Sequence, residues 1–145
     1  MFFIEKIMGR ILGLDYGSKT VGVAVTDGLG LTVQPLKTIT RDRESKLRKT
    51  LAEIAEIVSE YQVEKIVLGL PLNMDGTEGE RVEKTRAFRE LLEQRVTVPI
   101  EFEDERLTTM EAAEILTETG VKKEEQKQFI DQVAAQLILE GYLRG

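Results

Sequence analysis

The stretch ILGLDYGSKTVGVAVTD, residues 11–27, decides the fold, because an apolar run ends in a carboxylate, a glycine turn follows and a second apolar run returns. It predicts two strands joined by a tight turn, with Asp15 at the end of the first strand. In the second strand, three valines alternate with smaller residues, which is the side-chain period of a strand. Gly17 and Gly22 permit backbone conformations and close approaches that other residues resist.

The position of Asp15 indicates binding chemistry. A carboxylate at the end of a buried strand, beside backbone N–H groups and the hydroxyls of Ser18 and Thr20, favours a metal ion or a phosphate. The alternative is an aspartate that only caps its own turn. The spacing alone leaves both interpretations open.

The composition restricts the chemistry further. The chain of 145 residues contains no His and no Cys, which excludes Ser-His-Asp and Cys-His catalysis, disulfides and the common zinc sites. An enzyme of this composition has to use carboxylates, lysines, hydroxyls and a hard metal ion. The net charge of −6 disfavours a large nucleic-acid footprint, although local positive charge can oppose the total.

The chain has no apolar run of the roughly 18 residues that a membrane span needs. The absence of Cys is compatible with a reducing cytoplasm. We therefore expect one cytoplasmic α/β domain over residues 1–145, with no membrane contact. Residues 1–8 lack the pattern of a signal peptide and are expected to be an N-terminal extension.

Strands and helices alternate along the rest of the chain. Three successive strands with short links are antiparallel neighbours, and a strand that follows a helix is expected to be parallel. After the first two strands, the predicted elements are a strand over 31–40, a helix from 41–44 to about 61, a strand over 63–68, a helix over 80–94, a strand over 98–103, a helix from 108 or 109 to 120, a charged connection over 121–128 and a helix from about 127 to 143.

Two helices carry local positive charge. One group lies at the start of the helix after the third strand and comprises Arg41, Arg43, Lys46, Arg48 and Lys49. The other flanks the apolar stripe of the next helix and comprises Arg81, Lys84, Arg86 and Arg89. Solvated helix faces account for both groups, and contact with a substrate phosphate is the alternative for the first.

Acidic residues recur where they can converge. Asp104 and Glu105 follow a strand, and strands joined by right-handed crossovers end along one edge, which would bring them and the loop 69–79 beside Asp15. Asp131 is followed by Ala134 and Ala135 at i+3 and i+4, a face of small residues that permits close packing.

Such a cluster describes a site for Mg²⁺ or Mn²⁺, often with two ions about 4 Å apart, that hydrolyses phosphodiesters. The alternative for Asp131 is a residue in the first turn of its helix that interacts favourably with the helix dipole.

Four blocks, LDYGSKTVGVAVTD, VLGLPLNMDGTEG, DERLTT and FIDQVAAQLILEGYL, resemble the YqgF family of small ribonuclease-H-like proteins, described as Holliday-junction-resolvase homologues and pre-16S rRNA nucleases. The resemblance covers the chain from Gly9 onward. It implies a ribonuclease-H-like mixed five-stranded sheet in the order 3-2-1-4-5, with the second strand antiparallel and helices on both faces. It also implies a metal-dependent nuclease that matures the 5′ end of small-subunit rRNA, with the pre-ribosomal small subunit as its partner.

The acidic blocks of the family fall on Asp15, on Asp104 and Glu105, and on Asp131, which are the expected catalytic residues. Asp15 is expected to bridge two metal ions, with Glu105 or Asp104 and Asp131 as the other ligands. Strand parity does not separate Asp104 from Glu105 if the strand ends before them. The expected substrate-binding residues lie in three segments: Gly17, Ser18, Lys19, Thr20, Gly69, Pro71, Asn73, Asp75, Gly76, Arg106, Thr108 and Thr109.

Other functions fit parts of the pattern. A resolvase of branched DNA and a non-catalytic RNA-binding factor for ribosome assembly would both use this fold. Asp15 and Gly17, with Gly22, also resemble the first phosphate loop of actin-like and sugar-kinase ATPases. Such enzymes enclose nucleotide between two domains, and the chain shows no second loop of this kind.

Overall fold

The computed structural model of the chain describes residues 9–30, 32–106 and 108–145, and the predicted extension over residues 1–8 lies outside these ranges. The strands are β1 (Arg10–Tyr16), β2 (Thr20–Thr26), β3 (Val33–Thr40), β4 (Val63–Leu70) and β5 (Ile100–Asp104). The helices are α1 (Arg48–Glu60), α2 (Glu80–Glu93), α3 (Thr108–Glu118) and α4 (Lys123–Arg144).

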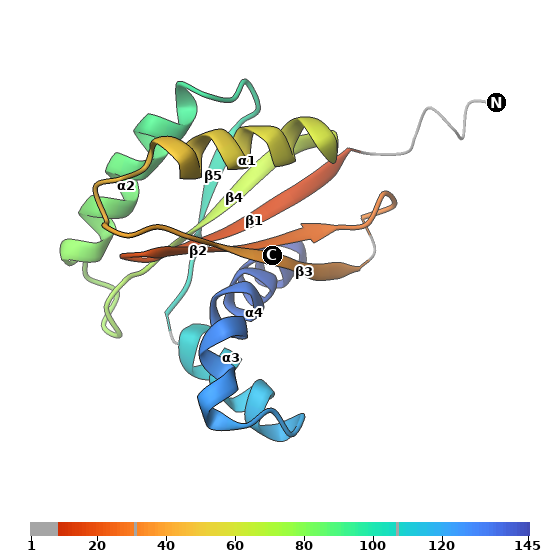
Figure 1. The fold of residues 1–145 in the computed structure, drawn as a ribbon, viewed down its shortest axis with the longest axis vertical. Coiled ribbons are helices and arrows are strands. Elements are labelled where there is room, and N and C mark those ends of the chain that lie inside the picture. Colours follow the sequence, from red (N-terminus) through yellow and green to blue (C-terminus); the bar gives the residue numbers. More distant parts are fainter. Residues whose placement is uncertain (1–8, 31, 107) are drawn as a thin grey trace.

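The five strands form one mixed sheet in the order β3-β2-β1-β4-β5 (Figure 1). β1 pairs with β2, and β2 with β3, in antiparallel fashion, whereas β1 with β4 and β4 with β5 are parallel. The predicted strand order and the antiparallel second strand are therefore confirmed. β1, β4 and β5 consequently end at one edge of the sheet, where α/β proteins place their ligands.

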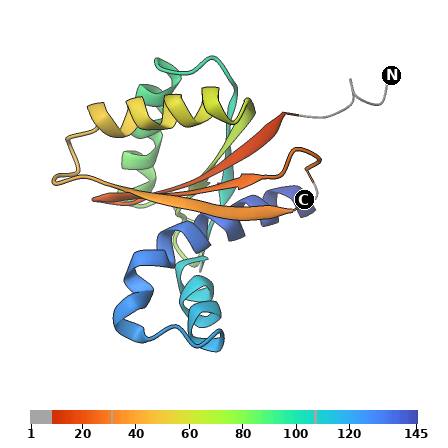
Figure 2. The same ribbon diagram turned by 45° about the vertical axis from the view of Figure 1, so that its right-hand side comes forward.

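Helices cover both faces of the sheet. α1 and α2 lie on one face, and α4 crosses the other with α3 packed against it (Figures 1 and 2). The larger core cluster lies under α1 and α2 and includes Leu14, Ile54 and Phe88. A smaller cluster under α4 contains Val67, Ile138 and Leu139.

Glycines make a flat seat for α4 on its face of the sheet. A Cβ at Gly22 would lie 1.9 Å from the backbone oxygen of Asp131, and a Cβ at Gly13 would lie 3.0 Å from that of Ala135. A Cβ at Gly69 would lie 2.5 Å from Cδ1 of Ile138. On the side of α4, the residues at this contact are small as well, and Ala134 and Ala135 are fully buried. We call Gly13, Gly22 and Gly69 the glycine seat.

Several predicted boundaries were wrong. α1 begins at Arg48 and not at 41–44, so residues 41–47 form a loop. The charged segment from 121 was predicted to be a connection, but α4 begins at Lys123. Its start is favourable because Glu124 and Glu125 occupy the first turn, where the helix dipole attracts acids. The ends of the strands differ from the predicted ends by one or two residues.

Across residues 9–30, 32–106 and 108–145, no helix combines the length and the apolar character that crossing a bilayer requires.

Candidate active site

Asp15 lies near the end of β1 with its side chain on the α4 face. Leu12 and Leu14 belong to the core under α1 and α2, so strand alternation turns Asp15 to the opposite face. Only 9% of the residue is exposed, and its neighbour across the antiparallel pair is Gly22. A carboxylate buried this deeply requires a cation, a proton or hydrogen-bond donors nearby.

Glu105 approaches Asp15 from the end of β5. Its backbone N–H donates to the carbonyl of Leu70 at 3.1 Å, which carries the strand pairing one residue past the end of β5. Side-chain alternation therefore continues and places Glu105 on the α4 face. A Cβ at Gly69 would lie 3.1 Å from Oε2 of Glu105, so the absent side chain leaves room for this carboxylate.

Asp104 is separated from this pair. It alternates with Glu105 along the chain and follows Ile100 and Phe102, which pack on the core under α1 and α2. Its side chain is 46% exposed and pairs with Nε of Arg106 at 3.0 Å. Glu105, and not Asp104, therefore lies beside Asp15.

Asp131 is brought to the site by the packing of α4. Its backbone lies directly on Gly22, the residue in register with Asp15. Because α4 begins at Lys123, Asp131 lies in the interior of the helix. The alternative that it serves the dipole of a first turn was based on the wrong helix start.

Burial and neighbouring charges shift the pKa values of Asp15 and Glu105. Burial, and then the negative charge of Asp131, raise the pKa of Asp15 to about 7, although a hydrogen bond with Glu105 opposes the shift. Burial and the charge of Asp15 raise the pKa of Glu105 to about 9. Titratable groups that interact this strongly bind protons as a pair. At neutral pH the site therefore keeps protons that solvent-exposed carboxyl groups would have lost.

The positive charge of Arg81 acts on both carboxyls, whereas the sequence interpretation favoured a solvated helix face for this residue. It lies in the first turn of α2, and its charge lowers the pKa of both Asp15 and Glu105. Its Nη1 pairs with Glu44 at 2.6 Å, and its Nη2 lies 3.4 Å from the carbonyl of Tyr16. The signal available in the sequence was an arginine opening the helix that follows the 71–79 loop.

Tyr16 anchors this edge of the sheet. Its ring stacks on Phe88 with centroids 4.2 Å apart. The guanidinium groups of Arg41 and Arg81 lie 4.9 and 5.4 Å from the centre of the Tyr16 ring. Arg41 also donates through Nη2 to the carbonyl of Gly17 at 2.7 Å, and thereby fixes the turn after Asp15.

That turn presents several of the predicted phosphate-binding residues. The N–H of Gly17 donates to the carbonyl of Thr20 at 2.7 Å and closes the turn. Ser18 and Lys19 are exposed beyond it. Thr108 is buried, and its N–H lies 3.4 Å from the carbonyl of Glu105. The side chain of Thr109 lies outside the described residues.

The loop after β4 is held by its own polar groups. Asn73 donates through Nδ2 to the hydroxyl of Thr77 at 3.0 Å, and that hydroxyl donates to Asp75 at 2.6 Å. Gly76 has a φ of +87° and packs near the guanidinium of Arg106. Asn73, Asp75 and Arg106 therefore shape the loop, while Pro71 lies at its start and Gly69 belongs to β4.

The donor set fits a hard divalent cation. Oε2 of Glu105 is buried with no hydrogen-bond partner, and two carboxyls with raised pKa values lie together with a third acid close by. Within the described ranges, no three acidic side chains form a complete ligand set as they stand. Oxygen ligands of this kind are those that Mg²⁺ and Mn²⁺ prefer.

Comparisons with known proteins show the family to which the chain belongs. The family model described as "RuvX: Holliday junction resolvase" matches residues 9–145. A protein of Agathobacter rectalis named "Putative pre-16S rRNA nuclease" is 54% identical over 134 residues, which cover 92% of this chain and 94% of that protein. A protein of the same name from Myxococcus xanthus is 50% identical over 134 residues, with 92% and 87% covered.

Two solved structures share the fold. T. thermophilus RuvC in complex with a Holliday junction substrate has a TM-score of 0.56 at 14% identity, and the match covers 94% of this chain and 96% of that one. The Fowlpox virus resolvase in complex with Holliday junction DNA has a TM-score of 0.54 at 10% identity, with 93% and 97% covered. These matches confirm the expected ribonuclease-H-like architecture.

Proposed function

Because this chain belongs to the RuvX family, also called YqgF, of resolvase-like nucleases, we propose that it is a metal-dependent phosphodiester hydrolase with its centre at Asp15, Glu105 and Asp131. The observation that carries this proposal is the buried pair of Asp15 and Glu105, with Oε2 of Glu105 unpartnered. Folding has placed negative charge where only a cation or protons can stabilise it.

Each residue has a distinct part in this proposal. Asp15, Glu105 and Asp131 would hold Mg²⁺ or Mn²⁺, which when bound activates water and neutralises charge on the scissile phosphate. Arg81 limits the repulsion between the acids before substrate arrives. Lys19, exposed on the turn after Asp15, is placed to bind a substrate phosphate.

The proposed substrate is the 5′ end of the small-subunit rRNA precursor, processed in the bacterial cytoplasm on the pre-ribosomal small subunit. The names of the relatives from Agathobacter rectalis and Myxococcus xanthus support this choice. The scarcity of aromatic residues, 6% of the chain and no Trp, favours recognition of backbone and shape over base stacking.

Cleavage of a four-way DNA junction is the second candidate, and the description of the matching family model favours it. The family match favours either nuclease over the actin-like ATP-binding alternative.

The test is cleavage of a 5′-extended small-subunit rRNA precursor and of a four-way DNA junction, side by side, in Mg²⁺ or Mn²⁺. We expect RNA trimming by the wild type and none by Asp15→Asn. Junction cleavage alone, lost in the variant, would establish the second candidate. If the wild type cuts neither substrate while both proteins bind RNA equally, the proposed hydrolase is wrong and a non-catalytic assembly factor takes its place.

A further inference from the structure

The two basic groups of the sequence have different environments in the structure. On α2 the basic side chains are ion-paired, Arg81 and Lys84 with Glu44, Arg86 with Glu78 and Arg89 with Glu93. Around the start of α1, no acid in the part of the chain that the structure describes pairs with Lys46, Arg48 or Lys49. The positive charge around the start of α1 is therefore available to bind an anion from another molecule.

These side chains line one cavity. It has a volume of about 450 Å³, and its basic residues are Arg41, Lys46, Arg48 and Lys49. Two acids, Asp42 and Glu53, also line it. Because Glu53 is paired with Lys37, the charge that the cavity presents is positive, in a chain whose net charge is −6. We call this cavity the basic pocket.

The N-terminal end of α1, which forms one wall of the basic pocket, lacks features that normally stabilise the start of a helix. α1 begins after Leu47 with no side-chain cap, and its first turn contains no acid. Arg48 and Lys49 instead put positive charge at the positive end of the helix dipole, where it is unfavourable. An anion in the basic pocket would interact favourably with these side chains and with the dipole together.

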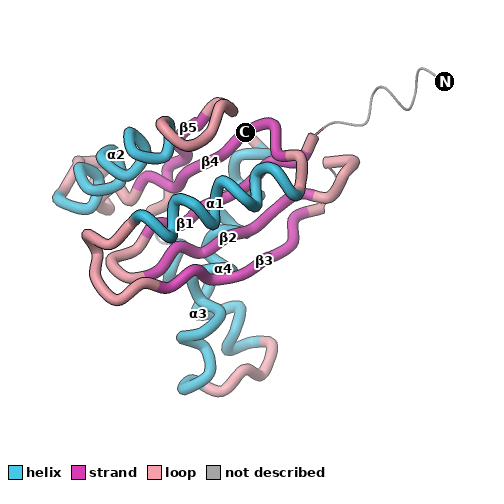
Figure 3. The backbone as a smooth tube through the Cα atoms, turned by 45° about the horizontal axis from the view of Figure 1, so that its top comes forward, coloured by secondary structure: helices cyan, strands magenta, loops and turns pink. Residues whose placement is uncertain are grey.

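The basic pocket lies at the same edge of the sheet as the candidate active site, on the side of the sheet that α1 covers. β1 and β3 run in the same direction, so the end of β1, the end of β3 and the start of α1 lie at one edge (Figures 1 and 3). Arg41 connects the two places, since it lines the pocket while its Nη2 donates to the carbonyl of Gly17, two residues after Asp15. Its Nη1 is buried without a hydrogen-bond partner.

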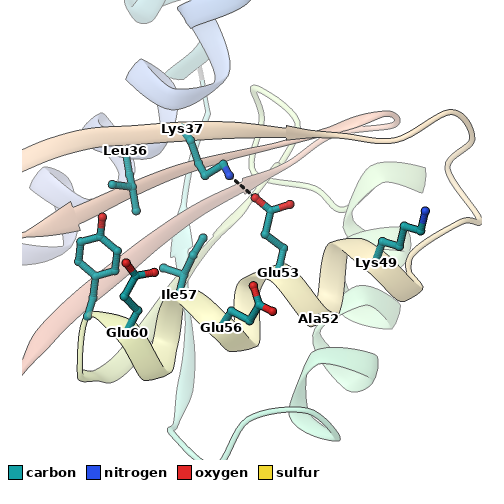
Figure 4. A pocket seen from close by; sticks show the side chains of 9 residues that line it. Leu36, Lys37, Lys49, Ala52, Glu53, Glu56, Ile57 and Glu60 are labelled. Atoms are coloured by element: carbon teal, nitrogen blue, oxygen red, sulfur yellow. Dashed lines mark hydrogen bonds and ion pairs between the residues drawn. The ribbon is translucent and has the colours of Figure 1, made fainter.

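The far half of α1 has the opposite charge. A neighbouring cavity of about 620 Å³ between β3 and α1 is lined by Glu56 and Glu60, and by the ion pair of Lys37 with Glu53 (Figure 4). Figure 4 shows Lys49 at the end of α1 away from Glu60. A polyanion bound at the basic pocket would therefore be repelled from the far half of α1.

We propose that the basic pocket binds the phosphodiester backbone of the substrate strand, several nucleotides away from the scissile phosphate held at Asp15. This inference rests on the proposed nuclease function and names a second contact of the same substrate. It predicts that strands long enough to reach both places bind more tightly than strands that cover the carboxylates alone.

The test uses Lys46→Ala combined with Lys49→Ala in the full chain. Both side chains are exposed, and Arg41 is retained because it fixes the turn. Binding of fluorescent single-stranded RNA and DNA of about four and about twelve nucleotides is measured by anisotropy against salt, with EDTA present. The matched control is Lys122→Ala with Lys123→Ala, an exposed basic pair at the start of α4.

For the longer strand we expect the slope of log Kd against log salt to fall by about 1.4, since each lost phosphate contact on a single strand contributes about 0.7. With this smaller slope, a tenfold dilution of salt strengthens binding by the variant about 25-fold less than it strengthens binding by the wild type. The short strand and the control pair should keep the wild-type slope. RNA and DNA behaving alike would identify the shared backbone as the ligand, and an effect on RNA alone would assign the contact to RNA.

An unchanged slope for the longer strand would overturn the inference. An equal decrease of the slope with the control pair would overturn it as well. An acidic protein surface would then be the better ligand for the pocket. Cleavage by the wild type is scored separately. Cleavage with an unchanged slope leaves the nuclease standing without this contact, whereas a changed slope without cleavage leaves the contact and removes the nuclease.

Discussion

Replacing Asp15 with Asn should make the protein more stable when no metal is bound. In the folded chain, burial and the charge of Asp131 raise the pKa of Asp15 from 3.8 to about 7. A carboxyl whose pKa is raised by folding stabilises the folded state while it is protonated. That stability is present below about pH 4 and is lost as the pH rises to about 7.

The size of the effect follows from the shift. About three pKa units correspond to about 4 kcal/mol at pH 8, taken as an upper limit because the coupled Glu105 shares the proton. Each kcal/mol changes the melting temperature of a domain of this size by roughly 2–4 °C. We therefore expect Asp15→Asn to melt several degrees above the wild type at pH 8 in EDTA, with a much smaller difference at pH 5.

The assay is thermal unfolding of both proteins from pH 5 to pH 8 in EDTA, repeated with Mg²⁺. Mg²⁺ should stabilise the wild type by about 2.7 kcal/mol at a hundred times its Kd, and the variant by less. Asp42→Asn removes an exposed carboxylate and serves as the control. A variant no more stable than the wild type at pH 8, or a difference that does not vary with pH, would refute the reasoning.

Three further predictions test other parts of the site. Gly22→Ala should lower the free energy of unfolding, measured in urea, by about 1–3 kcal/mol or more and should reduce cleavage, because the new methyl group overlaps α4. The control Gly28→Ala adds a methyl group in open space and should stay within about 0.5 kcal/mol of the wild type. Glu105→Gln should abolish cleavage in Mg²⁺ while Asp104→Asn keeps most of it, and the reverse order would show that the wrong acid was chosen. Arg81→Gln should move the acidic limb of the cleavage-pH profile to higher pH, because loss of its charge raises the pKa of the buried carboxyls further, and an unmoved limb would contradict this role.

The sheet order was predicted through the resemblance to the YqgF family, and the sequence pattern predicted only part of the candidate site. Asp15 was identifiable because a strand, a carboxylate and a glycine turn are local features. Glu105 and Asp104 were not separable, because the choice depends on one backbone bond to Leu70 that extends the strand pairing. Arg81 was missed because its role comes from the position of α2 over the edge of the sheet, which no local pattern records.

The start of α4 was also predicted wrongly from the sequence. A run of charged residues was interpreted as a connection, although acids in the first turn of a helix are favourable. The error mattered, since it placed Asp131 in a first turn and kept a purely structural explanation for it open. Only the contact of its backbone with Gly22 showed which part of the sheet it faces.

The packing of α4 on the glycine seat also sets the order in which the three acids come together as the chain folds. The strands that contribute Asp15 and Glu105 precede α4 in the chain, and the third acid arrives only when α4 settles on Gly13, Gly22 and Gly69. During synthesis, a nascent chain that has formed its sheet but not yet released α4 from the ribosome therefore lacks one acid of the proposed centre. If cleavage requires all three acids, the chain gains this activity only after its last helix has left the ribosome.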